Sequence, residues 1–166
     1  MQKITPCLWF DNQSEDAVAF YTAIFRNSRI ATITRYGEAG HEIHGKQAGT
    51  VMAVAFELDG QPFIALNGGP QFKFNEAISL VVNCATQQEV DYYWEKLSAG
   101  GKEGPCGWLK DKFGVSWQVF PTVLGEMLQD KDTEKSNRVM HAMLQMEKLD
   151  IKTLKQAFGQ KQNERP

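Results

Sequence analysis

The chain has 166 residues, of which 42% are hydrophobic and 23% charged, and its formal net charge is -2. A chain of this length buries about two thirds of the surface that it exposes when unfolded, so it can form a core without disulfides. The slight negative charge gives no basic footprint for nucleic acid, and no stretch is long and apolar enough to span a membrane. We therefore expect neither nucleic acid nor a membrane as a partner.

The N-terminal segment MQKITPCLWFDNQ has one lysine and a short apolar run that Pro6 interrupts. This is not the pattern of a signal peptide. The three cysteines, Cys7, Cys84 and Cys106, form an odd set without a CxxC pair. Such a set indicates buried, reduced thiols rather than a disulfide framework or a zinc site. We expect a cytoplasmic protein.

Residues 1–67 predict a β-α-β-β-β module. The apolar run Ile4–Phe10 predicts a strand, and Ser14 is in the position to cap the helix that follows. Strands are then predicted over Ser28–Tyr36, Val51–Leu58 and 61–67, with a glycine-rich loop between the first two. The dipeptide Asp59-Gly60 is a strong signal for a hairpin between the last two strands.

The same order of elements returns over residues 77–121 in a shorter module. Ala77–Cys84 predicts a strand, and Thr86 with Glu89 forms a capping-box pattern before a helix. The segments PCGWLKDKF and VSWQVFP supply the remaining strands. Residues 122–158 then predict a helical extension that includes an Asp150 cap, and residues 159–166 predict a disordered tail. We expect one compact unit overall.

Alternation along the strands divides their residues into two faces. One face is apolar and is expected to lie under the helices, while the other mixes aromatic and polar groups, as the lining of a small-molecule cleft does. The alternative is that the C-terminal helices cover this mixed face. The candidate ligand-binding residues are Thr5, Cys7, Trp9, Phe63, Asn67, Ser79, Gln118 and Phe120.

Four segments resemble the PhnB-like proteins, a group labelled demethylubiquinone 3-methyltransferase-like: LWFDNQSEDAVAFY, ALNGGPQFKFNEAISLVVNC, EVDYYWEKLSAGG and CGWLKDKFGVSWQVFP. The group is part of the vicinal oxygen chelate superfamily of glyoxalases, bleomycin-resistance proteins and extradiol dioxygenases. This resemblance implies an α+β fold in which paired modules form a curved half-barrel sheet. It also implies a homodimer.

The resemblance places the metal ligands of the superfamily at Thr5, Ala65, Ala77 and Gln118. Metals of the relevant kind prefer imidazole or carboxylate ligands, which these positions lack. The loop GHEIHG contains His41 and His44, but its spacing is not that of a helical metal motif, and we expect an exposed loop. We therefore expect neither a metal nor another cofactor.

The sequence also contains a candidate cysteine nucleophile and two glycine pairs that could form a cofactor site. Cys7 lies on the mixed face, but a reactive thiolate needs a neighbouring cation, and a structural thiol is the simpler interpretation. The pairs Gly68-Gly69 and Gly100-Gly101 lack the strand-to-helix context of a site for S-adenosylmethionine, and we interpret them as turn glycines.

Three functions remain open from the sequence. The first is metal-independent binding of a small aromatic or amphipathic molecule. The second is an enzyme, either a metal-dependent lyase or isomerase of the glyoxalase type or the methyltransferase that the family label implies. The third is an interaction module that uses the C-terminal methionines, Met127, Met140, Met143 and Met146, as a lid or a dimer contact, although these residues also suit simple core packing.

Overall fold

The structure is a computed structural model in which residues 3–160 are described. The chain divides into two compact units, Met1–Phe74 and Asn75–Pro166. The division falls between the two predicted modules. Each unit contains its own four-stranded sheet, and the α+β class with C-terminal helices is confirmed.

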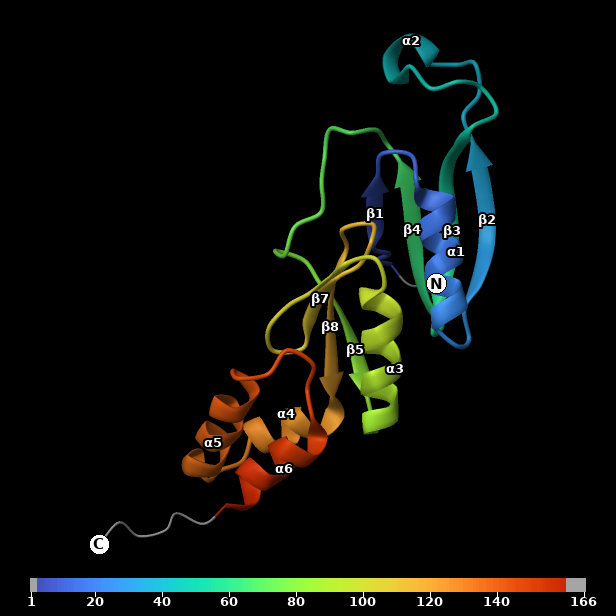
Figure 1. The fold of residues 1–166 in the computed structure, drawn as a ribbon. Helices are drawn as coiled ribbons and strands as arrows, with labels where there is room; N and C mark the ends of the chain where they lie inside the picture. The colour runs from blue at the N-terminus through green and yellow to red at the C-terminus, as the bar shows by residue number, and fades with distance from the viewer. Residues whose placement is uncertain (1–2, 161–166) are drawn as a thin grey trace, which may run out of the picture. The chain divides into compact units, whose positions relative to one another are not determined.

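The first unit has the strand order β1-β4-β3-β2, with β1 parallel to β4 and the other pairs antiparallel. Helix α1 packs against β3 and β4 (Figure 1). Asp59 and Gly60 both have positive φ, as the predicted hairpin turn requires. The elements are β1 (Cys7–Phe10), α1 (Ser14–Ile24), β2 (Arg29–Arg35), α2 (His41–His44), β3 (Val51–Leu58) and β4 (Gln61–Asn67).

The second unit repeats this order with shorter strands, as β5-β8-β7-β6, and β5 is parallel to β8. Its elements are β5 (Leu80–Cys84), α3 (Gln87–Ser98), β6 (Lys102–Glu103), β7 (Trp108–Lys110) and β8 (Ser116–Pro121). The predicted capping box is confirmed, because Thr86 Oγ1 accepts from the Glu89 amide and the Glu89 carboxylate accepts from the Ala85 amide.

The turn between β7 and β8 is organised by one buried carboxylate. Asp111 Oδ1 accepts from the backbone amides of Phe113 and Val115, at 2.8 and 3.0 Å. Its Oδ2 accepts from the Trp117 indole at 2.8 Å. The carboxylate therefore fixes both the turn and the position of a core tryptophan.

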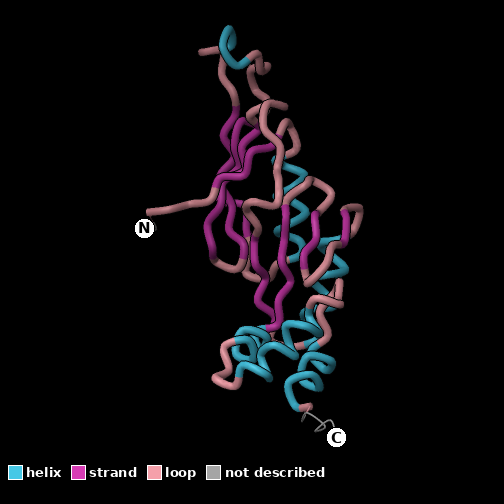
Figure 2. The backbone as a smooth tube through the Cα atoms, turned by 90° about the vertical axis from the view of Figure 1, so that its left-hand side faces the viewer, coloured by secondary structure: helices cyan, strands magenta, loops and turns pink. Residues whose placement is uncertain are grey.

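Three helices complete the second unit, and Figure 2 shows them gathered beyond one end of its strands. They are α4 (Thr122–Leu128), α5 (Thr133–Met143) and α6 (Ile151–Gly159). They enclose a core that includes Met127 and Met143, so core packing is confirmed for these two methionines. Helix α6 extends through Gly159, which the sequence had assigned to the tail, and residues 161–166 lie outside the described residues.

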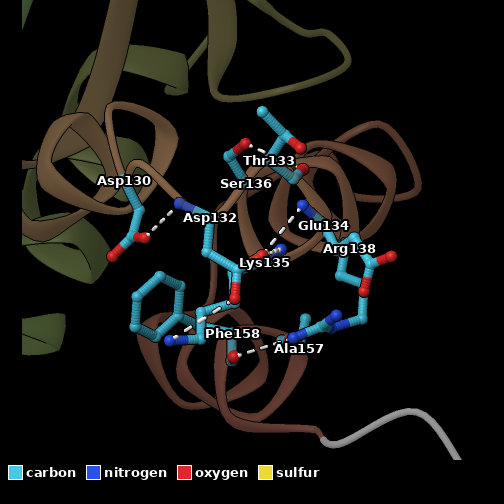
Figure 3. Close-up of polar contacts among 9 residues, drawn as sticks. All are labelled: Asp130, Asp132, Thr133, Glu134, Lys135, Ser136, Arg138, Ala157 and Phe158. Carbon is cyan, nitrogen blue, oxygen red and sulfur yellow. Dashed lines mark hydrogen bonds and ion pairs between the residues drawn. The ribbon is translucent and has the colours of Figure 1, made fainter.

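Side chains join α5 and α6 at their ends (Figure 3). Arg138 donates to the carbonyls of Ala157 and Phe158, at 3.0 and 3.3 Å, which satisfies two groups in the last turn of α6. Asp132 caps α5, and Asp150 caps α6 as predicted, with its Oδ1 accepting from the Thr153 amide. The helical extension is therefore a well-capped structure of its own.

The extension is also bonded to the second sheet. The amides of Cys106 and Gly107 donate to the carbonyls of Met146 and Glu147, each at 2.7 Å. Among residues 3–160, no helix has the length and apolar character needed to cross a membrane.

Candidate functional site

The strand register of the second unit identifies a face that α3 does not cover. Glu103, Leu109 and Trp117 form one row across β6, β7 and β8, and Glu103 accepts from the Trp94 indole of α3. The neighbouring row points to the opposite side, because residues alternate along a strand. We call this opposite side the open face of the second sheet. It carries Lys102, Lys110, Ser116, Trp108 and Gln118.

Two of the predicted ligand-binding residues meet on this face. Gln118 Nε2 donates to Ser79 Oγ at 2.7 Å, and both residues are half-buried. Gln118 is also the register partner of Trp108. Phe120 does not join them, because it packs against the core of the C-terminal helices. At Phe120, the C-terminal helices therefore cover the mixed face, as in the alternative that the sequence left open.

The predicted residues of the first unit lie partly on the equivalent open face of the first sheet. Thr5 and Cys7 are exposed. Trp9 is half-buried and tightly held: its indole donates to the Gly69 carbonyl at 2.9 Å, and its ring meets Phe72 edge to face at 5.0 Å between centroids. A side chain on Gly68 would collide with the same ring.

The predicted face of Phe63 and Asn67 is wrong. Both side chains are buried on the side of the first sheet that α1 covers. Asn67 Oδ1 accepts from the Ser14 amide at 2.9 Å, and its Nδ2 donates to the Val51 carbonyl at 3.0 Å. Asn67 therefore supports the start of α1, where Gln13 rather than Ser14 is in the cap position and makes no side-chain bond.

A hollow of about 490 Å³ opens beside β6 and β7, and its lining includes Lys102, Trp108, Lys110 and Ser116 of the open face of the second sheet. This volume is within the range of small-molecule sites. Lys110 and Glu76 form an ion pair of 2.5 Å at the hollow. The lining residues are Glu76, Lys102, Glu103, Gly104, Pro105, Trp108, Leu109, Lys110 and Ser116.

Two hydrogen-bond donors of this hollow lack protein partners. Ser116 is 2% exposed, and its Oγ has no hydrogen-bond partner among the described residues. Within the same part of the chain, the Trp108 indole also has none, whereas the indoles of Trp9, Trp94 and Trp117 donate to protein oxygens. A polar group without a partner is costly when it is buried, as Ser116 Oγ is, whereas the Trp108 indole is only half-buried and is available to a ligand acceptor.

A second hollow, of about 540 Å³, lies at the N-termini of α3 and α6. Thr86 and Asp150 already cap these helices, and Gln87 accepts from the Ile151 amide. No buried polar group without a partner points to a ligand there among the described residues. The hollow beside β7 is the stronger candidate.

Trp108, Lys110 and Glu76 were not predicted from the sequence as site residues. Trp108 and Lys110 are two positions apart in β7, and their register partners Gln118 and Ser116 are two positions apart in β8. The alternation of residues along each strand could therefore have indicated that the members of each pair share a face. The position of Lys102 opposite Lys110 depends on the register between β6 and β7, which periodicity does not give.

The positions carried over from the metal enzymes offer no carboxylate or imidazole. Ala65 is fully buried under α1, and the neighbouring residue on the open face, opposite Cys7, is Ile64. His44 lies in the short helix α2, where its Nδ1 accepts from the Lys46 amide and its Nε2 lies 3.3 Å from the Ala39 carbonyl. Within residues 3–160, no group of three His, Cys, Asp or Glu residues is placed to hold a metal ion.

The two glycine pairs do not fit a methyl-donor cofactor. The Trp9 ring fills the space beside Gly68, and the chain after Gly69 continues as a loop rather than a helix. Gly101 follows α3, and a side chain there would collide with the Lys110 carbonyl. Both pairs therefore pack against protein atoms, as turn glycines do.

Neither Cys7 nor Cys84 is an activated thiolate. Partial burial raises the pKa of the exposed Cys7 thiol above its ordinary value. Burial, with a smaller contribution from the Glu89 carboxylate, raises the pKa of Cys84 to about 12. Both thiols are protonated at neutral pH, which is the state of a structural cysteine.

Comparisons with known proteins agree with this fold. The family model described as 3-demethylubiquinone-9 3-methyltransferase matches residues 2–120. The PhnB protein from Bacillus cereus is 38% identical, with a TM-score of 0.63, over 73% of this chain and 100% of that chain. A search of curated protein sequences gave no match.

More distant solved structures share the fold alone. Protein PA1353 from Pseudomonas aeruginosa is 18% identical, with a TM-score of 0.59, over 73% of this chain and 98% of its own. The fosfomycin resistance protein FosX from Listeria monocytogenes, in complex with Mn(II) and sulfate, is 18% identical, with a TM-score of 0.53, over 78% of this chain and 100% of its own. The chain therefore belongs to the family described as 3-demethylubiquinone-9 3-methyltransferase, which includes PhnB-like proteins.

Proposed function

We propose that this protein binds a small aromatic or amphipathic molecule on the open face of the second sheet, without a metal ion. The observation that supports this most strongly is the hollow beside β7. It combines an apolar wall that includes Trp108 with two donors, the Trp108 indole and the Ser116 hydroxyl, that lack partners among the described residues. Ligand sites have this composition, mostly apolar with a few polar groups that fix orientation.

Neighbouring residues extend the proposed contact surface. The Gln118 amide lies beside Trp108 in the strand register, and its bond to Ser79 fixes its orientation. In the first unit, taken by itself, Thr5, Cys7 and Trp9 remain candidate ligand contacts on the open face of its own sheet. The family label names a methyl transfer, and the metal enzymes of the superfamily suggest a lyase, but neither chemistry has its usual residues at the corresponding positions of this chain.

A thermal-unfolding screen of EDTA-treated protein tests this proposal. A ligand at 100 times its dissociation constant adds about 2.7 kcal/mol, which raises the unfolding midpoint by about 5 to 10 °C. We expect small aromatic molecules to produce such shifts in the wild type and smaller shifts in Trp108→Ala, each relative to its own midpoint. Tyr92→Ala is the control, because it removes a partly exposed aromatic side chain of α3 that does not line the hollow, and it should retain the shifts.

The same assay, with added nickel, manganese, zinc or ferrous ion, tests metal independence. We expect no metal to stabilise the protein at one equivalent. Stabilisation by one of them, together with that metal in the untreated protein, would contradict the proposal and favour an enzyme of the glyoxalase type. Stabilisation by S-adenosylmethionine would instead favour methyl transfer.

We also propose a homodimer as the working form. Large apolar side chains remain exposed in each unit, including Ile4 at 83%, Ile78 at 78% and Val81 at 52%. Large exposed apolar side chains are candidates for a surface that another chain covers. Light scattering during gel filtration is expected to give twice the mass of one chain, and a monomeric mass at micromolar concentration would contradict this.

A further inference from the structure

We propose that the hollow beside β7 is selective for an aromatic molecule that carries a carboxylate, and that this carboxylate replaces the Glu76 side chain on Lys110. The inference rests on the proposed function, because it names the ligand class of the same hollow. Three features support it: the pairing of two lysines across strands, the position of Glu76, and the excess of free donors.

The first feature is a row of three residues across the strands. Lys102 lies opposite Lys110, which in turn lies opposite Ser116. Like charges that lie directly opposite each other across a sheet are destabilising. An anion beside both ammonium groups relieves this repulsion, so the row favours a negatively charged ligand.

The second feature is that a protein carboxylate already occupies this position. Glu76 lies 2.5 Å from Lys110. The pKa of the Glu76 carboxyl is held below its usual range, mainly by the hydrogen bond from the Lys110 ammonium. The backbone amide of Glu76 also lowers this pKa, and Lys102 makes a smaller contribution in the same direction. The Glu76 side chain is nevertheless 64% exposed. An ion pair this exposed is weak, so a ligand carboxylate can displace it.

The third feature is that the free polar groups of the hollow can all donate hydrogen bonds, and two of them, the Trp108 indole and the Lys102 ammonium, can only donate. The Ser116 hydroxyl, the Trp108 indole and the Lys102 ammonium have no hydrogen-bond or ion-pair partner in the described part of the chain. The second acidic residue of the lining, Glu103, is engaged elsewhere: it accepts from the Trp94 indole at 2.9 Å and from Ser98 Oγ at 3.3 Å. A complementary ligand must therefore supply acceptors.

The remaining lining favours an aromatic body for the ligand. Trp108 and Pro105 contribute apolar surface beside the donors. An indole face stacks with another aromatic ring in offset or edge-to-face geometry. An aromatic carboxylate combines this ring with the acceptor that the lysines and Ser116 require.

Benzoate and benzamide provide a matched test, because they share the ring and differ in charge. The readout is the indole N–H signal of Trp108 in a ¹⁵N–¹H spectrum of the EDTA-treated full chain, assigned with Trp108→Phe. Ligands of this size can have dissociation constants as weak as about 10 mM, so the titration must reach that order of concentration. We expect benzoate to shift the signal with at least about tenfold higher affinity than benzamide.

Charge variants make the test specific. Glu76→Gln is expected to strengthen benzoate binding about threefold, because it removes the competing carboxylate. Lys110→Met is expected to weaken it about tenfold, and Lys102→Met should act in the same direction. The matched controls are Glu95→Gln and Lys155→Met, which remove the same charges from side chains that do not line the hollow and should change the affinity by less than about twofold. The dispersion of each spectrum shows whether the variant is folded.

The outcomes separate this inference from the proposed function. Equal binding of benzoate and benzamide at Trp108, with no effect of Glu76→Gln, would overturn the carboxylate inference and leave small-molecule binding in place. If neither compound moves the Trp108 signal, the carboxylate inference also fails. The proposed function itself is tested separately, and it fails if the wider thermal screen finds no ligand whose effect depends on Trp108.

Discussion

Replacing Asp111 with alanine is expected to lower the free energy of unfolding of the second unit by about 3 to 5 kcal/mol. The substitution removes the acceptor of two backbone amides and of the buried Trp117 indole. Asp111 is 3% exposed, so water cannot replace the lost bonds without entering the core. Urea unfolding followed by tryptophan fluorescence measures the loss, since Trp94, Trp108 and Trp117 all lie in the second unit.

Two further variants control for this effect. Asp111→Asn retains one acceptor oxygen but loses the charge, so an intermediate loss is expected. Glu126→Ala removes an exposed acidic side chain from α4 and should change the stability by less than about 0.5 kcal/mol. A loss below about 1 kcal/mol for Asp111→Ala would show that the turn does not depend on this carboxylate.

Replacing Asn67 with alanine is expected to destabilise the first unit by about 2 to 4 kcal/mol. Two buried backbone groups, the Ser14 amide and the Val51 carbonyl, lose their partners. Amide hydrogen exchange in β3 and β4 measures this stability separately from that of the second unit. Ligand binding in the hollow beside β7 should be unchanged in the folded protein.

Asn12→Ala is the matched control, because Asn12 is exposed beside the start of α1. It should leave hydrogen exchange in the first unit unaltered. If Asn67→Ala left exchange unchanged but abolished ligand binding, Asn67 would return to the ligand-binding role that the sequence first predicted for it.

Local signals in the sequence predicted several elements correctly. The two strands Val51–Leu58 and 61–67 were predicted at their observed bounds. The Asp59-Gly60 turn determines where the first of them ends and the second begins. The caps at Thr86 and Asp150 were also predicted correctly. Each of these features depends on residues within a few positions in the chain.

Local signals could not predict which face of β4 is buried under α1. Alternation gives two sets of residues but does not say which set is buried, and a shift of one residue exchanges them. Ile64 and Leu66 are more apolar than Asn67, so hydrophobicity alone favours the wrong set. Asn67 is buried because its amide satisfies the Ser14 amide, a contact between residues 53 positions apart that only the folded chain creates.

The hollow beside β7 also depends on tertiary structure. Its row of Lys102, Lys110 and Ser116 is set by strand register, and Glu76 reaches it from the segment before β5. Nothing in the spacing of these four residues along the chain indicates that they meet. The covering of Phe120 by the C-terminal helices is similar, and these helices lie beyond the residues that the family model matches.

The most direct test of the account is a ¹⁵N–¹H spectrum of the four tryptophan indoles in EDTA-treated protein, recorded while small aromatic molecules are added. The indoles of Trp94 and Trp117 donate to protein oxygens in the second unit and serve as internal references. The account predicts that ligands shift the Trp108 signal selectively in the absence of metal. Ligands that shift the signals only after a divalent metal is added, or a Trp108 signal that never moves, would contradict it.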